Sequence, residues 1–427
     1  MFENCKGTSM IQDEFLMKLY GTDAVERERR RYADLFKGMP PEAGSPENAR
    51  VFSAPGRTEL GGNHTDHNRG RVLAAAIHLD AVAVVVPRSD RTVFFRSAGF
   101  PDVLVNLDGA DGLSPRPEEQ GTTEALVRGI AAEFARRGVP PGGFSANASS
   151  TVLPGSGLSS SAAVEVLLAK IFDTLYGGGR CSALELAQIS QKAENDYFGK
   201  PSGLMDQAAS ASGGVVAIDF ADPDAPEVTA LDFDPLSAGL ALCVVNTRGS
   251  HADLTPDYAA IPHDMKAVAR FFSKSFLREV DLSLLLAHAG ELRRAVGDRA
   301  LLRAVHFCNE NRRAQAMAET KDMGRFLELV NESGDSSWEL LQNLYSPRDH
   351  RQQGLPLALA ISREFFREQG IQAACRVHGG GFAGTIQAYV PVAALDDYRG
   401  RMEALFDTGA LTVLRIRPVG AVELTAP

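Results

Sequence analysis

One stretch of fifteen residues, GRTELGGNHTDHNRG at positions 56–70, contains several residue types that bind small polar ligands. It carries two carboxylates, two histidines and two arginines among four glycines. Histidine and carboxylate side chains can hold a metal ion, and carboxylates can accept hydrogen bonds from sugar hydroxyls. Glycines allow the tight backbone that lets such groups converge. The stretch therefore predicts a metal site, a sugar site or a polar turn.

A second stretch, GSGLSSSAAVEVLLAK at 155–170, predicts a loop that binds phosphate groups. A strand pattern precedes it, its glycines permit close approach of a ligand, and its serines can cap the helix that follows. Free N–H groups and the dipole at such a helix start attract anions. It is not a Walker A loop, because the required lysine is absent. An ordinary serine-capped helix is the alternative. The predicted phosphate loop comprises Gly155, Ser156, Gly157, Leu158, Ser159, Ser160 and Ser161.

A third stretch, GGGFAG at 379–384, has the spacing of a dinucleotide-binding fingerprint. That interpretation requires a helix to follow, and the pattern that follows, TIQAYV, is typical of a strand. The stretch therefore predicts either a glycine turn close to a ligand or a simple hairpin turn.

These motifs need strands and helices to position them. Periodicity predicts helices at 10–37 and 120–137, a helix after the phosphate loop, and a largely helical region at 258–345. It predicts a strand beginning at residue 50, a buried strand pair at 71–88, and strands at 92–99 and 142–153. Residues 375–390 are predicted as strand, glycine turn and strand.

Taken in chain order with three further stretches, these motifs resemble the galactokinase family of the GHMP kinase superfamily. The first stretch is similar to the family signature Gly-Arg-x-Asn-Leu-x-Gly-Glu-His-Thr-Asp-Tyr-Asn-x-Gly. The further stretches are AENDYFGKPSGLMDQ at 193–207, NTRGSHADLTPDY at 246–258 and AVHFCNENRRAQAMAE at 304–319. The resemblance runs from about residue 50 to residue 390.

The resemblance implies an α+β fold of two domains, expected at 1–215 and 216–427, with the active site in the cleft between them. It implies transfer of the γ-phosphoryl of MgATP to the anomeric C1 hydroxyl of galactose, with ATP as co-substrate and Mg²⁺ as cofactor. Asp206 matches the catalytic aspartate and Arg57 the arginine beside it. Ser161 and Glu194 match the Mg²⁺ ligands. The residues expected to bind the sugar are Asn63, His64, Asp66, Gly203 and Tyr258.

The chain departs from the family signature at three positions of the first stretch. Glu59 stands where the family has Asn, Asn63 where it has Glu, and His67 where it has Tyr. The resemblance implies that the family Glu accepts a hydrogen bond from the sugar C6 hydroxyl. Asn63 can still accept one but carries no charge, so it would tolerate the C6 carboxylate of galacturonate. Galacturonate is therefore the alternative substrate. Glu59 could replace the lost acid or pair with Arg57 or Arg69.

Two other classes of function remain open. A metal-dependent hydrolase could use His64, Asp66, His67 and His78 as ligands, but it would leave the serine loop unexplained. A non-catalytic sugar sensor would be expected to have lost the phosphate loop or the catalytic aspartate, and this chain keeps both.

Composition limits the partners. The chain has 427 residues, of which 44% are hydrophobic, and a formal charge of −10, which disfavours nucleic acid and anionic membranes. No signal peptide or membrane span is visible, and the five cysteines, an odd number without a CxxC pair, suit a reducing compartment. We therefore expect a cytoplasmic enzyme that binds a sugar and ATP as a monomer or weak oligomer.

Overall fold

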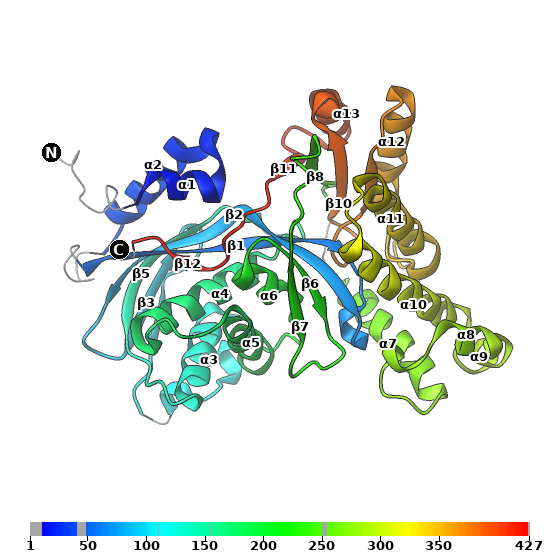
Figure 1. The fold of residues 1–427 in the computed structure, drawn as a ribbon. Helices are drawn as coiled ribbons and strands as arrows, with labels where there is room; N and C mark the ends of the chain where they lie inside the picture. Colours follow the sequence, from blue (N-terminus) through cyan, green and yellow to red (C-terminus); the bar gives the residue numbers. More distant parts are fainter. Residues whose placement is uncertain (1–10, 41–47, 110, 154, 250–253, 426–427) are drawn as a thin grey trace.

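The computed structural model describes residues 11–40, 48–109, 111–153, 155–249 and 254–425 (Figure 1). Its strands form an eight-stranded sheet and a four-stranded sheet, with helices packed on both. The predicted α+β class is confirmed. Among the described residues, no helix combines the length and the apolar character needed to cross a bilayer.

The large sheet has the order β12-β1-β2-β5-β3-β4, with β6 paired to β2 and β7 to β6. All its pairings are antiparallel except that of β3 with β5. Its strands are β1 (Arg50–Gly61), β2 (Arg71–Pro87), β3 (Thr92–Ser97), β4 (Val103–Asn106), β5 (Phe144–Ser150), β6 (Val215–Asp219), β7 (Glu227–Leu231) and β12 (Val422–Glu423).

Two details of the predicted elements are corrected. The strand pair expected at 71–88 is one strand, β2, because the run lacks turn-forming residues and its two halves pair with different neighbours, β6 and β5. The helix expected at 10–37 is two helices, α1 (Asp13–Tyr20) and α2 (Val25–Lys37), because Gly21 ends the first with a φ of 89°.

Helices cover both faces of the large sheet (Figure 1). One face carries α3 (Thr123–Arg136), α4 (Ser160–Phe172), α5 (Ala183–Ala193) and α6 (Met205–Ser212), and the other carries α1 and α2. Apolar residues of β1, β2 and β5 pack against α3 and α4 in the main core. This packing fixes the ends of β1, β5, α4 and α6, where the predicted site residues lie.

The small sheet has the antiparallel order β11-β8-β10-β9. Its strands are β8 (Leu240–Asn246), β9 (Ala374–Val377), β10 (Thr385–Pro391) and β11 (Leu411–Leu414). Alternate residues of β8 face opposite sides: Leu242 and Val244 join the main core, while Cys243 and Val245 join a second core with α12 (Gly354–Gln369) and α13 (Leu395–Phe406).

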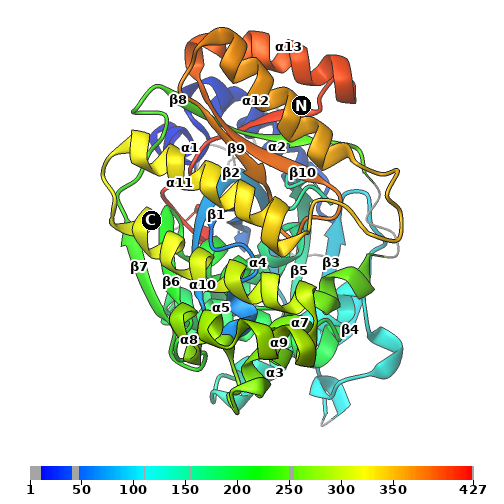
Figure 2. The ribbon, with the colours of Figure 1, turned by 90° about the vertical axis from the view of Figure 1, so that its right-hand side faces the viewer.

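A set of helices lies between β8 and β9 in the chain and runs across the front of the molecule in Figure 2. They are α7 (Thr255–Phe271), α8 (Leu282–Ala287), α9 (Ala289–Val296), α10 (Asp298–Glu319) and α11 (Met323–Ser336). The division at 215/216 stays a prediction. The pairing places β6, which spans that point, and β7 and β12, which follow it, in the large sheet.

Candidate active site

Arg57 and Asp206 meet where β1 passes the start of helix α6. Arg57 Nε donates a hydrogen bond of 2.7 Å to Asp206 Oδ1, and Nη2 lies 2.7 Å from the same oxygen. Its Nη1 donates to the Gly157 carbonyl in the phosphate loop. Arg57 is only 6% exposed, so its guanidinium is held in place by packing as well as by these contacts. One arginine thus joins the predicted catalytic acid to the predicted phosphate loop.

Asp206 is held and yet accessible. The Asp206 side chain is 33% exposed. Ser159 Oγ donates a hydrogen bond to Asp206 Oδ2. Burial raises the pKa of Asp206, but the Arg57 charge and the hydrogen bonds from Arg57 and Ser159 outweigh burial and hold the pKa below its usual value. Its place in the first turn of α6 favours the charged form further. Asp206 is therefore a carboxylate at neutral pH.

The phosphate loop connects β5 to α4 as predicted. Gly155 and Gly157 have φ values of 70° and 71°, which glycine adopts without strain. The expectation that the serines at 159–161 cap the helix is wrong, because no side chain among the described residues makes a capping hydrogen bond at the start of α4. Ser159 stands at the N-cap position of α4 in left-handed geometry, and its hydroxyl binds Asp206 instead of a helix N–H.

Both sheets hold this loop. Thr385 Oγ1, on β10, donates a hydrogen bond of 2.9 Å to the Ser156 carbonyl. His378 joins the two sheets, since its Nδ1 lies 3.0 Å from Thr385 Oγ1 and its Nε2 3.0 Å from Thr58 Oγ1 on β1. A Cβ on Gly157 would come within 3.1 Å of the His378 ring, so the loop needs glycine there.

The residues implied as Mg²⁺ ligands offer hard oxygen donors, which suit this ion. Ser161 is exposed in the first turn of α4. Glu194 is 2% exposed; its Oε1 accepts from Lys200 Nζ at 2.7 Å and its Oε2 from Gln207 Nε2 at 2.9 Å. Across the described parts of the chain, no cluster of three His, Cys, Asp or Glu could hold a metal alone. A Mg²⁺ bound here would therefore rely on ATP oxygens and water as well.

Three of the predicted sugar-binding residues pack tightly against other predicted motifs. His64 Nε2 lies 2.9 Å from the Gly380 carbonyl, and Tyr258 Oη donates a hydrogen bond of 2.9 Å to the Gly381 carbonyl. Asp66 lies against Gly203, where a Cβ would come 2.3 Å from Asp66 Oδ2. Residues 250–253, part of the stretch that ends at Tyr258, lie outside the described residues.

The contact of His64 with the glycine turn fixes its tautomer. A carbonyl only accepts, so Nε2 carries the proton and Nδ1 keeps its lone pair. Burial lowers the pKa of His64 to about 4, although the Gly380 carbonyl and Asp66 favour the charged form. His64 is therefore neutral at pH 7 and can accept a hydrogen bond through Nδ1.

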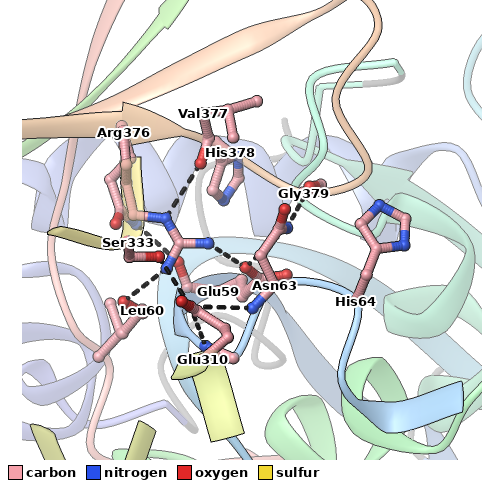
Figure 3. Close-up of polar contacts among 12 residues, drawn as sticks. Glu59, Leu60, Asn63, His64, Glu310, Ser333, Arg376, Val377, His378 and Gly379 are labelled. Carbon is pink, nitrogen blue, oxygen red and sulfur yellow. Dashed lines mark hydrogen bonds and ion pairs between the residues drawn. The ribbon is translucent and has the colours of Figure 1, made fainter. Parts of the chain in front are cut away.

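Asn63 is enclosed by protein groups (Figure 3). Its Nδ2 donates to Glu59 Oε1 at 3.1 Å and to the Gly379 carbonyl at 2.7 Å, and its Oδ1 accepts from Asn343 Nδ2 at 3.0 Å. Glu59 forms an ion pair with Arg376, and not with Arg57 or Arg69, the two arginines that the sequence offered as possible partners. Asn63 is 1% exposed, and both amide hydrogens and one lone pair of Oδ1 take part in this network.

Helix α10 fixes the backbone of the same loop. Glu310 Oε1 accepts from Gly62 N at 3.1 Å and Asn63 N at 3.3 Å, and His306 Nε2 donates to the Asn63 carbonyl at 3.0 Å. Sequence patterns pointed to this helix but not to Arg376 and Asn343. The only sequence sign of Arg376 is a charged residue within the apolar strand before GGGFAG.

Comparisons with known proteins show which structural class this chain belongs to. A family model described as "GHMP kinases N terminal domain" matches residues 125–214. The solved structure of Lactococcus lactis galactokinase complexed with galactose superposes with a TM-score of 0.75 at 22% identity, covering 93% of this chain and 99% of that one. Methanococcus jannaschii mevalonate kinase superposes with a TM-score of 0.60 at 14% identity, covering 88% and 99%. The fold is that of the GHMP kinases.

The family follows from two further matches. A family model described as "Galactokinase galactose-binding signature" matches residues 42–87. A galactokinase of Streptomyces coelicolor is 32% identical over 396 residues, covering 90% of this chain and 94% of that protein. The chain belongs to the galactokinase family, which makes it an ATP-dependent sugar kinase and excludes the metal-dependent hydrolase.

Proposed function

We propose that this protein transfers the γ-phosphoryl of ATP to the anomeric C1 hydroxyl of galactose, giving galactose 1-phosphate and ADP. The observation that carries the proposal is the triple contact of Arg57 with Asp206 and the phosphate loop, in a chain of the galactokinase family. Phosphoryl transfer depends mainly on positioning and charge stabilisation, and this arrangement supplies both.

Each residue has a role that follows from its surroundings. Asp206 accepts or orients the proton of the C1 hydroxyl, because it is a carboxylate held at two oxygens. Arg57 keeps that carboxylate charged and offsets charge on the transferring phosphoryl. The N–H groups at the start of α4 bind phosphate. His64 and Asp66 bind sugar hydroxyls, with Gly203 and Tyr258 forming the adjoining surface.

Ser161 and Glu194 would hold Mg²⁺, which neutralises charge on the ATP phosphates when it is bound. We place the protein in the cytoplasm, since the four described cysteines are free thiols that a reducing environment preserves. We expect it to act as a monomer or weak oligomer.

The test is a screen of the purified protein with MgATP and galactose, galacturonate, N-acetylgalactosamine or glucose, with ADP release as the readout. We expect galactose-dependent ADP release, and we expect NMR of the product to place the phosphate on C1. Binding of galactose without ADP release would support the sugar sensor and contradict the proposal.

A further inference from the structure

Glu59 and Asn63 stand in direct contact, and each occupies the place that the family signature gives to the other residue type. The signature that residues 56–70 resemble has Asn at the place of residue 59 and Glu at the place of residue 63, whereas this chain has Glu59 and Asn63. The hydrogen bond of 3.1 Å from Asn63 Nδ2 to Glu59 Oε1 joins them. The same two chemical groups are therefore present, with their positions exchanged.

In this chain the negative charge of the pair lies inside the protein, on Glu59. Glu59 is 4% exposed and forms an ion pair with Arg376, which is fully buried. Arg376 also donates to the Leu60 carbonyl at 3.0 Å and the Val377 carbonyl at 3.1 Å (Figure 3). A buried guanidinium needs such a counter-charge, so the acid at position 59 has a structural task.

In this chain the side chain of Asn63 joins the loop after β1 to the glycine turn at 379–384. Asn63 donates to the Gly379 carbonyl, and Asn343 Nδ2 donates both to Asn63 Oδ1 at 3.0 Å and to the Gly380 carbonyl at 3.1 Å. The Gly380 carbonyl is the same oxygen that accepts from His64. Both amide hydrogens of Asn63 are donated to protein groups, and its side chain is 1% exposed, so burial closes the carboxamide to a sugar hydroxyl.

We propose that Glu59 and Asn63 are an exchanged pair, in which Asn63 positions the glycine turn that holds His64 and the sugar site has no charge at position 63. This prediction rests on the proposed function: because residue 63 carries no charge, the enzyme does not repel the C6 carboxylate of a sugar acid at this position. The C6 selectivity set by charge in the family arrangement should therefore be weak in this chain.

A stability cycle tests the exchange without reference to activity. Glu59→Asn leaves Arg376 without its counter-charge, and Asn63→Glu places two carboxylates beside one guanidinium, so each single variant should lower Tm. The double variant restores one acid and one amide, and we expect its Tm to lie above that of either single variant. A double variant whose loss in Tm equals the sum of the single losses would overturn the exchanged pair. If a single variant does not fold, Glu59→Gln and Asn63→Asp repeat the cycle with little change in volume.

Kinetics test the consequence for the sugar. Relative to wild type, the double variant should lower kcat/KM for galacturonate against that for galactose by about tenfold or more, mainly through KM, since an acid again stands at position 63. The control is Glu423→Gln, which removes an ion pair with Arg50 at the far end of β1 and should leave the ratio unchanged. An unchanged ratio in the double variant would overturn the claim that the residue at position 63 sets C6 selectivity.

A wild-type protein without sugar kinase activity would instead contradict the proposed function. In that case the Tm measurements would still show whether Glu59 and Asn63 act as an exchanged pair.

Discussion

At the residue scale, Asp206 is held from two sides, with Arg57 on one oxygen and Ser159 on the other. Asp206→Asn keeps the size of the side chain but removes the negative charge that accepts or orients the proton. We expect kcat to fall by about 10²–10⁴-fold. Tm should fall as well, because asparagine leaves the buried Arg57 guanidinium without its counter-charge. Asp298→Asn, at an exposed surface ion pair, is the control. A kcat near wild type for Asp206→Asn would remove the aspartate from the mechanism.

Glu165, one turn along α4 from Ser161, gives a pH dependence. Burial, and then the nearby Glu194, raise the pKa of Glu165 from the ordinary 4.5 to about 8. The folded protein therefore binds a proton that the unfolded chain releases above pH 4.5, and Glu165 stabilises the fold less as pH rises from 4.5 to 8. The slope from one such group is at most about 1.4 kcal/mol per pH unit.

Glu165→Gln should remove this slope, because glutamine resembles the neutral acid and still accepts from Gln207. The variant should therefore gain stability relative to wild type as pH rises from 5 to 8. The measurement is Tm at several pH values for both proteins. A difference in Tm that stays constant over this range would show that Glu165 is ionised throughout.

At the element scale, the segment before α6 lies directly against the turn that follows β1. Gly203 is the point of closest approach, since a Cβ there would come 2.3 Å from Asp66 Oδ2. Gly203→Ala should push Asp66 aside and raise KM for the sugar more than KM for ATP. Gly400→Ala, where nothing lies near the added methyl group, is the control. Equal changes in both KM values would argue against a role for this contact in sugar binding.

The elements also show what the sequence could predict. Local patterns predicted most strands and helices and the glycine-serine loop between β5 and α4, because periodicity and glycine spacing are local signals. The strand pair at 71–88 was wrong because the pairing of β2 with three strands is set by distant parts of the chain. The same holds for the Glu59 partner: Arg376 lies 317 positions away, and no local pattern joins the two. The roles of the site residues remain predictions.

At the scale of the whole molecule, the first two helices and the last strand that the structure describes pack on or pair with the large sheet. Strand β12 pairs with β1, and α1 and α2 cover the face opposite α4 and α6 (Figure 1). Buried Asp80, in the middle of β2, links these parts: its Oδ1 accepts from Arg31 on α2 at 2.7 Å, and its Oδ2 from Arg417 at 2.9 Å and Tyr20 at 2.6 Å. One carboxylate thus joins the N-terminal helices to the C-terminal segment.

Replacing this carboxylate should destabilise the molecule without touching catalysis. Burial alone would raise the pKa of Asp80, but the charges of Arg31 and Arg417 hold it below its usual value, so the stabilisation is present at neutral pH and is lost in acid. Asp80→Asn leaves two guanidiniums facing a neutral amide and should lower the free energy of unfolding by about 3–5 kcal/mol. KM for sugar and ATP should not change, because this cluster lies on the sheet face opposite the phosphate loop.

Denaturant unfolding measures the loss of stability, and steady-state kinetics measures the two KM values. The control is Asp102→Asn, at an exposed ion pair, which should lower the free energy of unfolding by at most about 1 kcal/mol. A loss for Asp80→Asn no larger than that of Asp102→Asn would mean that the Asp80 carboxylate does not hold the N-terminal helices in place.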